Sequence, residues 1–207
     1  MGRTSDARDR LMEAASKLIW EYSYGSVTID AICEQAGVKK GSFYYFFESK
    51  PDLAVAAIDV WWIKRKALME ELFQGDIPPL ARIQKYFDFV SQKQLAAFRA
   101  TGQILGCPLF SLGSEISTQD ERIRLRIHGI IVAMTRYFEE AIAEAKLTGE
   151  VESRDPVLTT RILLTYYAGV LIRARTENNP EILETLTSDC FEVIGVSMAT
   201  AGASSEF

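Results

Sequence analysis

Residues 37–50 read GVKKGSFYYFFESK, and this stretch decides which fold the N-terminal part of the chain adopts. Five consecutive aromatic residues, 43–47, follow two lysines, a glycine and a serine. Aromatic residues are enriched in strands, so local composition alone indicates a buried β-strand. A short helix with one face in a core and the other toward a partner is the alternative.

Helical phasing separates these aromatic residues by chemical type. At about 100° per residue, Phe43, Phe46 and Phe47 fall on one side of a helix. Tyr44 and Tyr45 fall on or beside the opposite side, next to small and basic residues. A strand would instead place phenylalanine and tyrosine together on one face, because its side chains alternate. The pattern therefore predicts a short helix with a buried phenylalanine side and an exposed tyrosine side.

The residues before this stretch predict two further helices and a tight turn. Apolar residues recur at spacings of three and four over 11–22, which is typical of an amphipathic helix. Thr28 offers an N-cap for a second helix that runs to Ala36. Gly37 stands where a left-handed residue commonly ends a helix. Together these signals predict a helix-turn-helix over 28–47.

The rest of the chain is also helical in pattern, with no convincing strand or repeat. Ser49 and Asp52 form a capping-box pattern at the start of a helix that continues to about residue 73. Further helices are expected over 79–102, 108–117, 120–147, 155–177 and 181–200. The predicted fold is all-α with about nine helices: a helix-turn-helix domain of three helices at 1–50, a larger helical domain for ligand sensing and dimerisation at 51–201, and a disordered tail at 202–207.

Composition limits the possible functions. The chain has 207 residues, 48% hydrophobic and 25% charged, and a net charge of −5. This balance argues against a generally basic nucleic-acid coat but leaves room for a local basic site. Residues 1–50 carry seven basic and seven acidic side chains, whereas 37–50 carry three and one. Non-specific DNA affinity should therefore be modest, and two copies would be needed for tight binding.

Cysteine usage and hydropathy indicate an intracellular protein. Cys33, Cys107 and Cys190 are odd in number and far apart, without metal-ligand spacing. No apolar run approaches the ~18 residues that span a bilayer. We therefore expect a cytoplasmic protein without a metal, a cofactor or a membrane partner.

Residues 8–58 contain an ordered pattern of small, apolar, aromatic and basic residues: Ala14-Ala15, Leu18, Gly25, Thr28, Ile32, Ala36-Gly37-Val38, Lys40-Gly41-Ser42, Phe43-Tyr44-Tyr45, Phe47, Ser49-Lys50 and Leu53. This pattern resembles the N-terminal domain of the TetR/AcrR family of bacterial transcriptional regulators. The family often has histidine where this chain has Phe46, a departure on the inward face. The resemblance implies a third helix that reads the major groove and a C-terminal domain that senses a ligand and dimerises.

The outward side of the third helix suits a DNA groove. Small residues let the helix N-terminus approach closely, and lysines with exposed N–H groups attract phosphates. Tyrosine hydroxyls can bond phosphate, and their rings can touch thymine methyl groups. The candidate DNA-binding residues are Thr28, Lys39, Lys40, Gly41, Ser42, Tyr44, Tyr45 and Lys50.

The segment GQILGCPLFSLGSEIS, residues 102–117, is the most specific feature of the C-terminal part. It resembles a Gly-Cys segment, followed by leucine and glutamate, in NemR-like, AcuR-like and LmrA-like members of the family. The resemblance implies a segment that links the ligand pocket to the DNA-binding domain. Cys107 precedes a helix, and helix N-termini lower thiol pKa values. It is either a reactive sensor thiol or a small buried cysteine.

A pocket for an aromatic, uncharged or weakly anionic effector is expected among the aromatic residues of this part. Each aromatic residue has ordinary core packing as its alternative. Arg173 could anchor a carboxylate or form a surface pair, and His128 is interpreted as structural or solvent-facing. The candidate ligand-binding residues are Trp61, Trp62, Tyr86, Phe89, Cys107, Phe110, Tyr137, Tyr166 and Arg173.

The last two helices carry apolar stripes that suit a homodimeric four-helix bundle. The candidate interface residues are Leu158, Ile162, Gly169, Leu186, Cys190, Val193, Ile194 and Ser197. A two-fold dimer matches a pseudo-palindromic operator.

The sequence therefore predicts a ligand-responsive DNA-binding regulator rather than an enzyme. We expect a repressor that a small apolar, aromatic or electrophilic effector releases from double-stranded operator DNA. An alternative is a redox or electrophile sensor that acts through Cys107. A helical enzyme that uses Cys107 and His128 is remote, because paired carboxylates, a phosphate loop and an oriented Cys-His-Asp set are missing. A helical adaptor that does not bind DNA is the remaining alternative.

Overall fold

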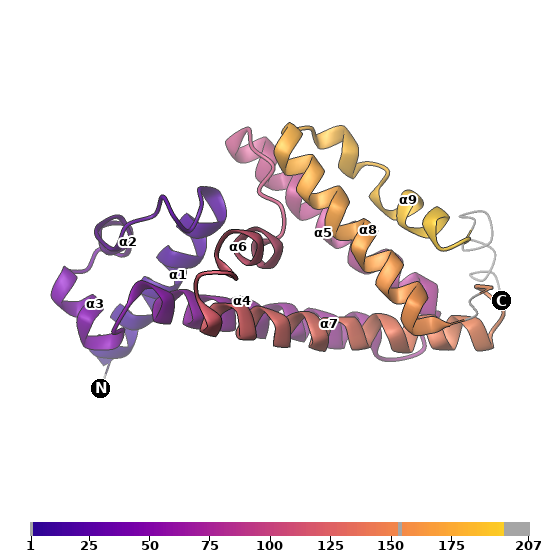
Figure 1. Cartoon of the computed structure of the whole chain (residues 1–207), viewed down its shortest axis with the longest axis horizontal. Helices are drawn as coiled ribbons and strands as arrows, with labels where there is room; N and C mark the ends of the chain where they lie inside the picture. Colours follow the sequence, from indigo (N-terminus) through magenta and orange to yellow (C-terminus); the bar gives the residue numbers. More distant parts are fainter. Residues whose placement is uncertain (1, 153–154, 197–207) are drawn as a thin grey trace. The chain divides into compact units, whose positions relative to one another are not determined.

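The computed structural model describes residues 2–152 and 155–196, and every regular element in this part is helical (Figure 1). The all-α fold of about nine helices is confirmed for the described residues, and the tail expected at 202–207 lies outside them. The α-helices are α1 (Gly2–Glu21), α2 (Ile29–Ala36), α3 (Lys40–Phe46), α4 (Lys50–Phe73), α5 (Pro79–Thr101), α6 (Pro108–Ile116), α7 (Glu121–Leu147), α8 (Pro156–Glu177) and α9 (Leu186–Val193), with a 3-10 helix at Pro180–Leu183.

The chain forms two compact units. The first unit contains the residues up to Arg65 and Pro108–Ile130, and the second contains Lys66–Cys107 and the residues from Ile131 onward. The boundary between the two compact units does not lie at residue 50, because α4 continues past that residue and α6 packs on α1. The functional boundary expected near residue 50 stays a prediction.

The first unit is built around the phenylalanine side of α3. Phe43 is fully buried and Phe47 is 4% exposed, in a core that Leu11, Ile32 and Leu53 share. Phe46 is half-buried against the same core. The predicted inward side of α3 is thereby confirmed.

Local signals set the ends of these helices. The Thr28 hydroxyl accepts a hydrogen bond from the Ala31 N–H at 3.1 Å, as expected of an N-cap. Gly37 has φ 62°, the left-handed conformation predicted for the end of α2. The Ser49 hydroxyl accepts a hydrogen bond from the Asp52 N–H and contacts the Asp52 carboxylate at 2.5 Å, so the expected cap of α4 is present.

The second unit has an aromatic core. α5 contacts α9 and the 3-10 helix, and both of these also contact α8. The rings of its core pack edge to face or stacked at centroid distances between 5.1 and 6.4 Å, which is the usual range for aromatic pairs. The cluster comprises Phe73, Tyr86, Phe87, Tyr137, Phe138 and Tyr167.

Side chains of α5 and α8 hold the linker that leads to α6. The buried Gln94 amide donates to the Gly106 carbonyl at 2.8 Å and accepts from the Gly106 N–H at 2.9 Å. Arg175 donates to the Leu105 carbonyl at 2.8 Å. The Asn178 side chain accepts from the Ile104 N–H at 2.9 Å. Because buried backbone groups need partners, these contacts fix the conformation of residues 104–106.

The single helix expected over 181–200 is wrong. The Asn179 side chain caps a 3-10 turn that starts at Pro180 and buries Leu183, and α9 begins only at Leu186. Gly195 has φ 77°, a conformation that ends a helix, so α9 stops before it. Residues 197–200 lie outside the described part.

Within the described residues, one helix, α8, is long and apolar enough to cross a membrane by length and composition. Its apolar residues divide into two sets. One set, including Leu163 and Leu171, is buried in the second unit, and the other forms an exposed stripe that includes Ile162 and Ile172. Two apolar sides are typical of a helix that packs in a core on one side and against a further helix on the other. In the single chain, the second side of α8 faces solvent.

Candidate DNA-binding site

The outward side of α3 presents two tyrosines. Tyr44 is 55% exposed and Tyr45 is 73% exposed, although both are large aromatic residues. Lys39 is also exposed, and the space around Gly41 is open, since a Cβ placed there would meet no atom within 4 Å. The predicted face of lysine, glycine, serine and tyrosine is present, with Ser42 half-buried at its edge. Whether it contacts DNA stays a prediction.

The two lysines that open α3 differ in their surroundings. Lys40 pairs with Asp30 of α2 at 2.8 Å, and this hydrogen bond raises the pKa of the Lys40 ammonium. A phosphate would compete with the Asp30 carboxylate for this ammonium. Lys39 is the N-cap residue of α3 and is exposed, so it is the better placed of the two to meet a phosphate.

Lys50 is held by its own chain. Its amino group donates to the Tyr24 carbonyl and lies 4.2 Å from the centroid of the Tyr24 ring. Burial lowers the pKa of Lys50, while the nearby Glu115 carboxylate raises it to a smaller extent. The Lys50 amino group therefore has a partner within its own chain, and whether it also contacts a DNA backbone stays a prediction.

A carboxylate of α6 holds the turn between α1 and α2. Glu115 accepts hydrogen bonds from the backbone N–H groups of Tyr24, at 2.9 Å, and Gly25, at 2.6 Å. A Cβ on Gly25 would lie 2.9 Å from a Glu115 oxygen, so a larger residue there would require the Glu115 carboxylate to shift, and glycine permits this close approach. With Lys50 on the Tyr24 carbonyl, these contacts tie α6, the turn and the start of α4 together. We call this set of four residues the Glu115 clamp.

Arg10 supports the helix-turn-helix, and sequence reasoning missed it. Its guanidinium donates to the Ala36 carbonyl at 3.0 Å, which satisfies an end of α2 just before α3 begins. It also pairs with Asp6 at 3.3 Å. No local pattern could have indicated this contact, because Arg10 and Ala36 are 26 residues apart.

The candidate ligand-binding residues are divided between the two units, and whether they bind a ligand stays a prediction. Tyr86 and Tyr137 both pack on Phe73 in the aromatic core, where Tyr86 is 1% exposed. Arg173 is on the surface and pairs with Glu177 at 2.6 Å, which is the surface-pair alternative. Trp62 is buried, and Phe89, Cys107, Phe110 and Tyr166 are half-buried.

Trp61, by contrast, lines a pocket in the first unit together with Trp20. His128 is exposed, as one of its two interpretations expects. No group of three metal-ligating side chains occurs among the described residues.

The candidate interface residues divide by exposure. Leu158, Ile162 and Val193 are 41%, 44% and 41% exposed, and Gly169 is exposed, so all four can meet a partner. Ile194 is half-buried.

Two of the candidate interface residues need correction, and one cannot be placed. Leu186 and Cys190 are fully buried within their own chain, so their side chains have no surface to offer a second copy. The apolar stripe that suggested them faces the core of the second unit. Burial also raises the pKa of the Cys190 thiol to about 12. Ser197 lies outside the described residues.

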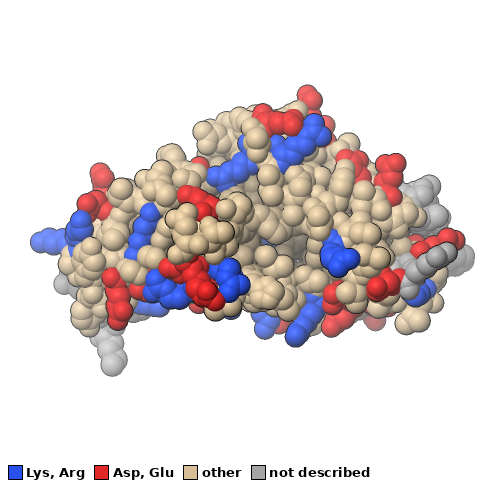
Figure 2. Space-filling view, viewed as in Figure 1, with Lys and Arg blue, Asp and Glu red and all other residues tan. Residues whose placement is uncertain are grey.

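Basic and acidic side chains are mixed on the face of the protein that Figure 2 shows. In Figure 2, Lys and Arg alternate with Asp and Glu over the visible face, without a broad field of one sign. Several pairs are local, such as Arg122 with Asp120 at 2.9 Å and with Asp52 at 2.6 Å. This face therefore offers DNA no broad basic surface.

Both parts of the chain match known families. Residues 11–57 match the model of bacterial regulatory proteins of the tetR family, and residues 79–189 match the tetracyclin repressor-like C-terminal domain.

Individual relatives cover most of the chain. The transcriptional regulator AcuR of Cereibacter sphaeroides is 28% identical over 87% of this chain and 82% of its own length. The transcriptional repressor DhaR of a Mycobacterium species is 27% identical over 94% of each. The crystal structure of a regulatory protein TetR from Rhodobacter sphaeroides has a TM-score of 0.80 and 26% identity, over 90% of this chain and 98% of that one.

The Glu115 clamp makes a prediction about stability. Glu115→Ala removes two charge-assisted hydrogen bonds and should lower the free energy of unfolding by about 1–3 kcal/mol. Glu121→Ala removes an exposed carboxylate that pairs with Arg124 in the same unit, and should cost less than about 0.5 kcal/mol. Urea denaturation at one fixed protein concentration measures both. Equal losses in the two variants would contradict the role of Glu115.

Proposed function

Since the chain belongs to the TetR family of transcriptional regulators, we propose that it represses its target genes by binding a pseudo-palindromic operator through α3. The observation that carries this proposal is the division of α3 into two faces. Phe43 and Phe47 fix the helix in the core, and Tyr44 and Tyr45 are left exposed on the opposite side. Exposing two large aromatic rings is costly unless they have a partner, and a DNA groove offers phosphate oxygens and base edges to them.

A homodimer supports operator binding. The exposed stripe of α8, with Leu158, Ile162, Gly169 and Ile172, is apolar and lacks a large residue at Gly169, where an added Cβ would meet no atom within 4 Å. Two such stripes packed about a two-fold axis would bury this surface in a helical bundle. The two α3 helices would then contact half-sites one helical turn apart, or further apart if dimers stack.

A small-molecule effector would act by favouring a state that binds DNA less well. It can do so only if its affinity differs between the two states. Because Glu115 and Lys50 hold the turn between α1 and α2, a shift of α6 or of the start of α4 changes the support of the helix-turn-helix. We place the response in the Glu115 clamp for this reason.

The α3 face makes a prediction about DNA affinity. Tyr44→Ala should weaken operator binding at least about tenfold, since it removes a ring and a hydroxyl from the contact surface. Lys39→Ala should weaken it and reduce the slope of log affinity against log salt by about one. Fluorescence anisotropy with labelled DNA from beside the gene, at several salt concentrations, measures both.

The matched control is Lys85→Ala, which removes an exposed lysine from α5 of the second unit. It should change neither affinity nor salt slope. Unchanged DNA binding in both α3 variants would show that this face does not contact the operator.

The α8 stripe makes a prediction about assembly. Ile162→Glu places a charge in the proposed interface and should shift the protein from dimer to monomer, with loss of operator binding. Leu147→Glu alters a residue that is 88% exposed at the end of α7 and should leave the dimer intact. Analytical ultracentrifugation distinguishes the species, and a stable Ile162→Glu dimer would rule out this interface.

Cys107 gives an alternative trigger for the same release. It is half-buried beside Pro108 at the start of α6, after the linker that Gln94 and Arg175 hold. A covalent adduct on its sulfur would enlarge the side chain at this junction. If Cys107 is the sensor, Cys107→Ser should abolish release of the operator by an alkylating electrophile such as N-ethylmaleimide. An equal response of wild type and variant would exclude a thiol sensor at this position.

A further inference from the structure

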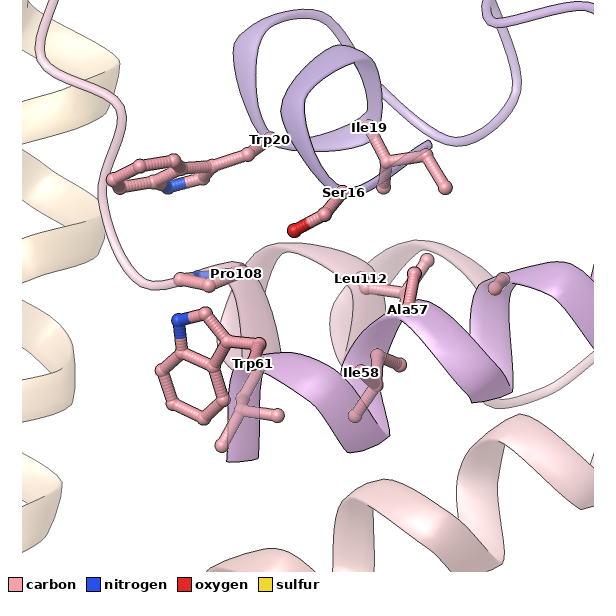
Figure 3. Close-up of a pocket in the computed structure, with 10 residues that line it drawn as sticks. Ser16, Ile19, Trp20, Ala57, Ile58, Trp61, Pro108 and Leu112 are labelled. Carbon is pink, nitrogen blue, oxygen red and sulfur yellow. The ribbon is translucent and has the colours of Figure 1, made fainter. Parts of the chain in front are cut away.

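A small apolar pocket lies between α1, α4 and α6 within the first unit (Figure 3). About 350 Å³ of space, including the part open to solvent, is free of protein atoms. The enclosed cavity itself holds only about 30 Å³, far below the volumes of ligand sites, about 300–1,000 Å³, so the pocket is closed in this state. Its principal lining residues are Ser16 and Trp20 of α1, Ala57 and Trp61 of α4, and Leu109 and Leu112 of α6.

The lining selects a neutral, flat guest. The residues that line the pocket are all apolar or aromatic except Ser16, and none of them is charged. Figure 3 shows the indole rings of Trp20 and Trp61 on either side of Pro108, with the Ser16 hydroxyl near them. Two indole rings favour an aromatic guest that can stack, and one hydroxyl offers it a single hydrogen bond.

The pocket and the Glu115 clamp share α6. Leu109 and Leu112 are 1% and 3% exposed and form one wall, and Glu115 follows three residues after Leu112 on the same helix. Little of the free space is wide enough for even a water molecule in this state. A ring-sized guest would therefore have to move α6 away from α1 and α4.

Such a movement would act on the clamp directly. Glu115 reaches the turn through hydrogen bonds of 2.6 and 2.9 Å. N–H···O hydrogen bonds in proteins lie at about 2.7–3.2 Å, and a separation of about 3.6 Å is no longer a hydrogen bond. A displacement of α6 by about an ångström would be enough to lengthen both. The turn between α1 and α2 would then lose its support from α6.

We propose that this pocket binds a small neutral aromatic compound of one or two rings, and that the bound state releases the Glu115 clamp and weakens operator binding. This inference rests on the proposed function, and it adds the chemical class and the location of an effector. The guest prefers the opened state, so operator DNA, which prefers the closed state, must weaken guest binding by the same factor.

Indole is a suitable probe because it is neutral, flat and has one hydrogen-bond donor. The chain contains three tryptophans, so the side-chain N–H signals of ¹⁵N-labelled protein report on the pocket individually. Titration with unlabelled indole should shift the signals of Trp20 and Trp61. The signal of Trp62, which is buried and does not line the pocket, should move much less. Shifts of Trp62 alone, or no shifts at millimolar indole, would overturn the proposal.

Variants that fill the pocket test the location. Ser16→Leu adds bulk at a half-buried position on the rim and should reduce indole affinity at least about tenfold. Ala57→Leu fills the buried floor and should do the same, and either variant suffices if the other does not fold. Ala96→Leu, at an exposed position of α5, is the matched control and should bind indole as wild type does. Wild-type affinity in a folded pocket variant would refute the assignment.

Operator binding separates this inference from the proposed function. Without indole, wild type should bind the operator, which tests the proposed function alone. With saturating indole, wild type should lose affinity several-fold, whereas Ser16→Leu should not. If DNA binds and indole does not change its affinity in wild type, the pocket is not an effector site and the regulator assignment still stands.

Discussion

The contact between the Glu115 carboxylate and the N–H groups of Tyr24 and Gly25 is the constraint on which the account of this regulator depends. The helix-turn-helix has its own small core, but the turn between α1 and α2 is held from outside by α6 and by Lys50. A carboxylate that accepts two backbone hydrogen bonds stabilises the contact strongly, but only while the atoms stay within hydrogen-bond distance. The contact therefore stabilises one position of α6 and is lost when α6 moves away from that position.

Features that arise from neighbouring residues could be predicted from the sequence. The phasing of α3 follows from the chemical difference between Phe43 and Tyr44, and both ended on their expected sides. Thr28 and Gly37 form hydrogen bonds with backbone groups a few residues away, so their roles as helix caps could be predicted from the local sequence. Family resemblance then added the function, which periodicity alone could not supply.

Features that join distant parts of the chain could not be predicted. Glu115 and Tyr24 are 91 residues apart, and nothing in either segment indicates the other. The contact of Lys50 with the Tyr24 carbonyl was also missed, because a long cation near a helix start has many possible partners and the sequence does not rank them. Leu186 and Cys190 belong to an apolar stripe with helical periodicity, and this periodicity predicts a buried side of a helix. It does not distinguish burial in the core of the same chain, where both residues lie, from burial in an interface.

Amide hydrogen exchange at the turn between α1 and α2 tests the central claim most directly. In wild type, the Tyr24 and Gly25 amides should be protected, because the Glu115 carboxylate binds both of them, and in Glu115→Ala this protection should be lost. The Ile32 amide, bonded within α2 to the Thr28 carbonyl, serves as an internal reference and should change little. Fast exchange of Tyr24 and Gly25 in wild type, or equal protection in Glu115→Ala, would contradict the account.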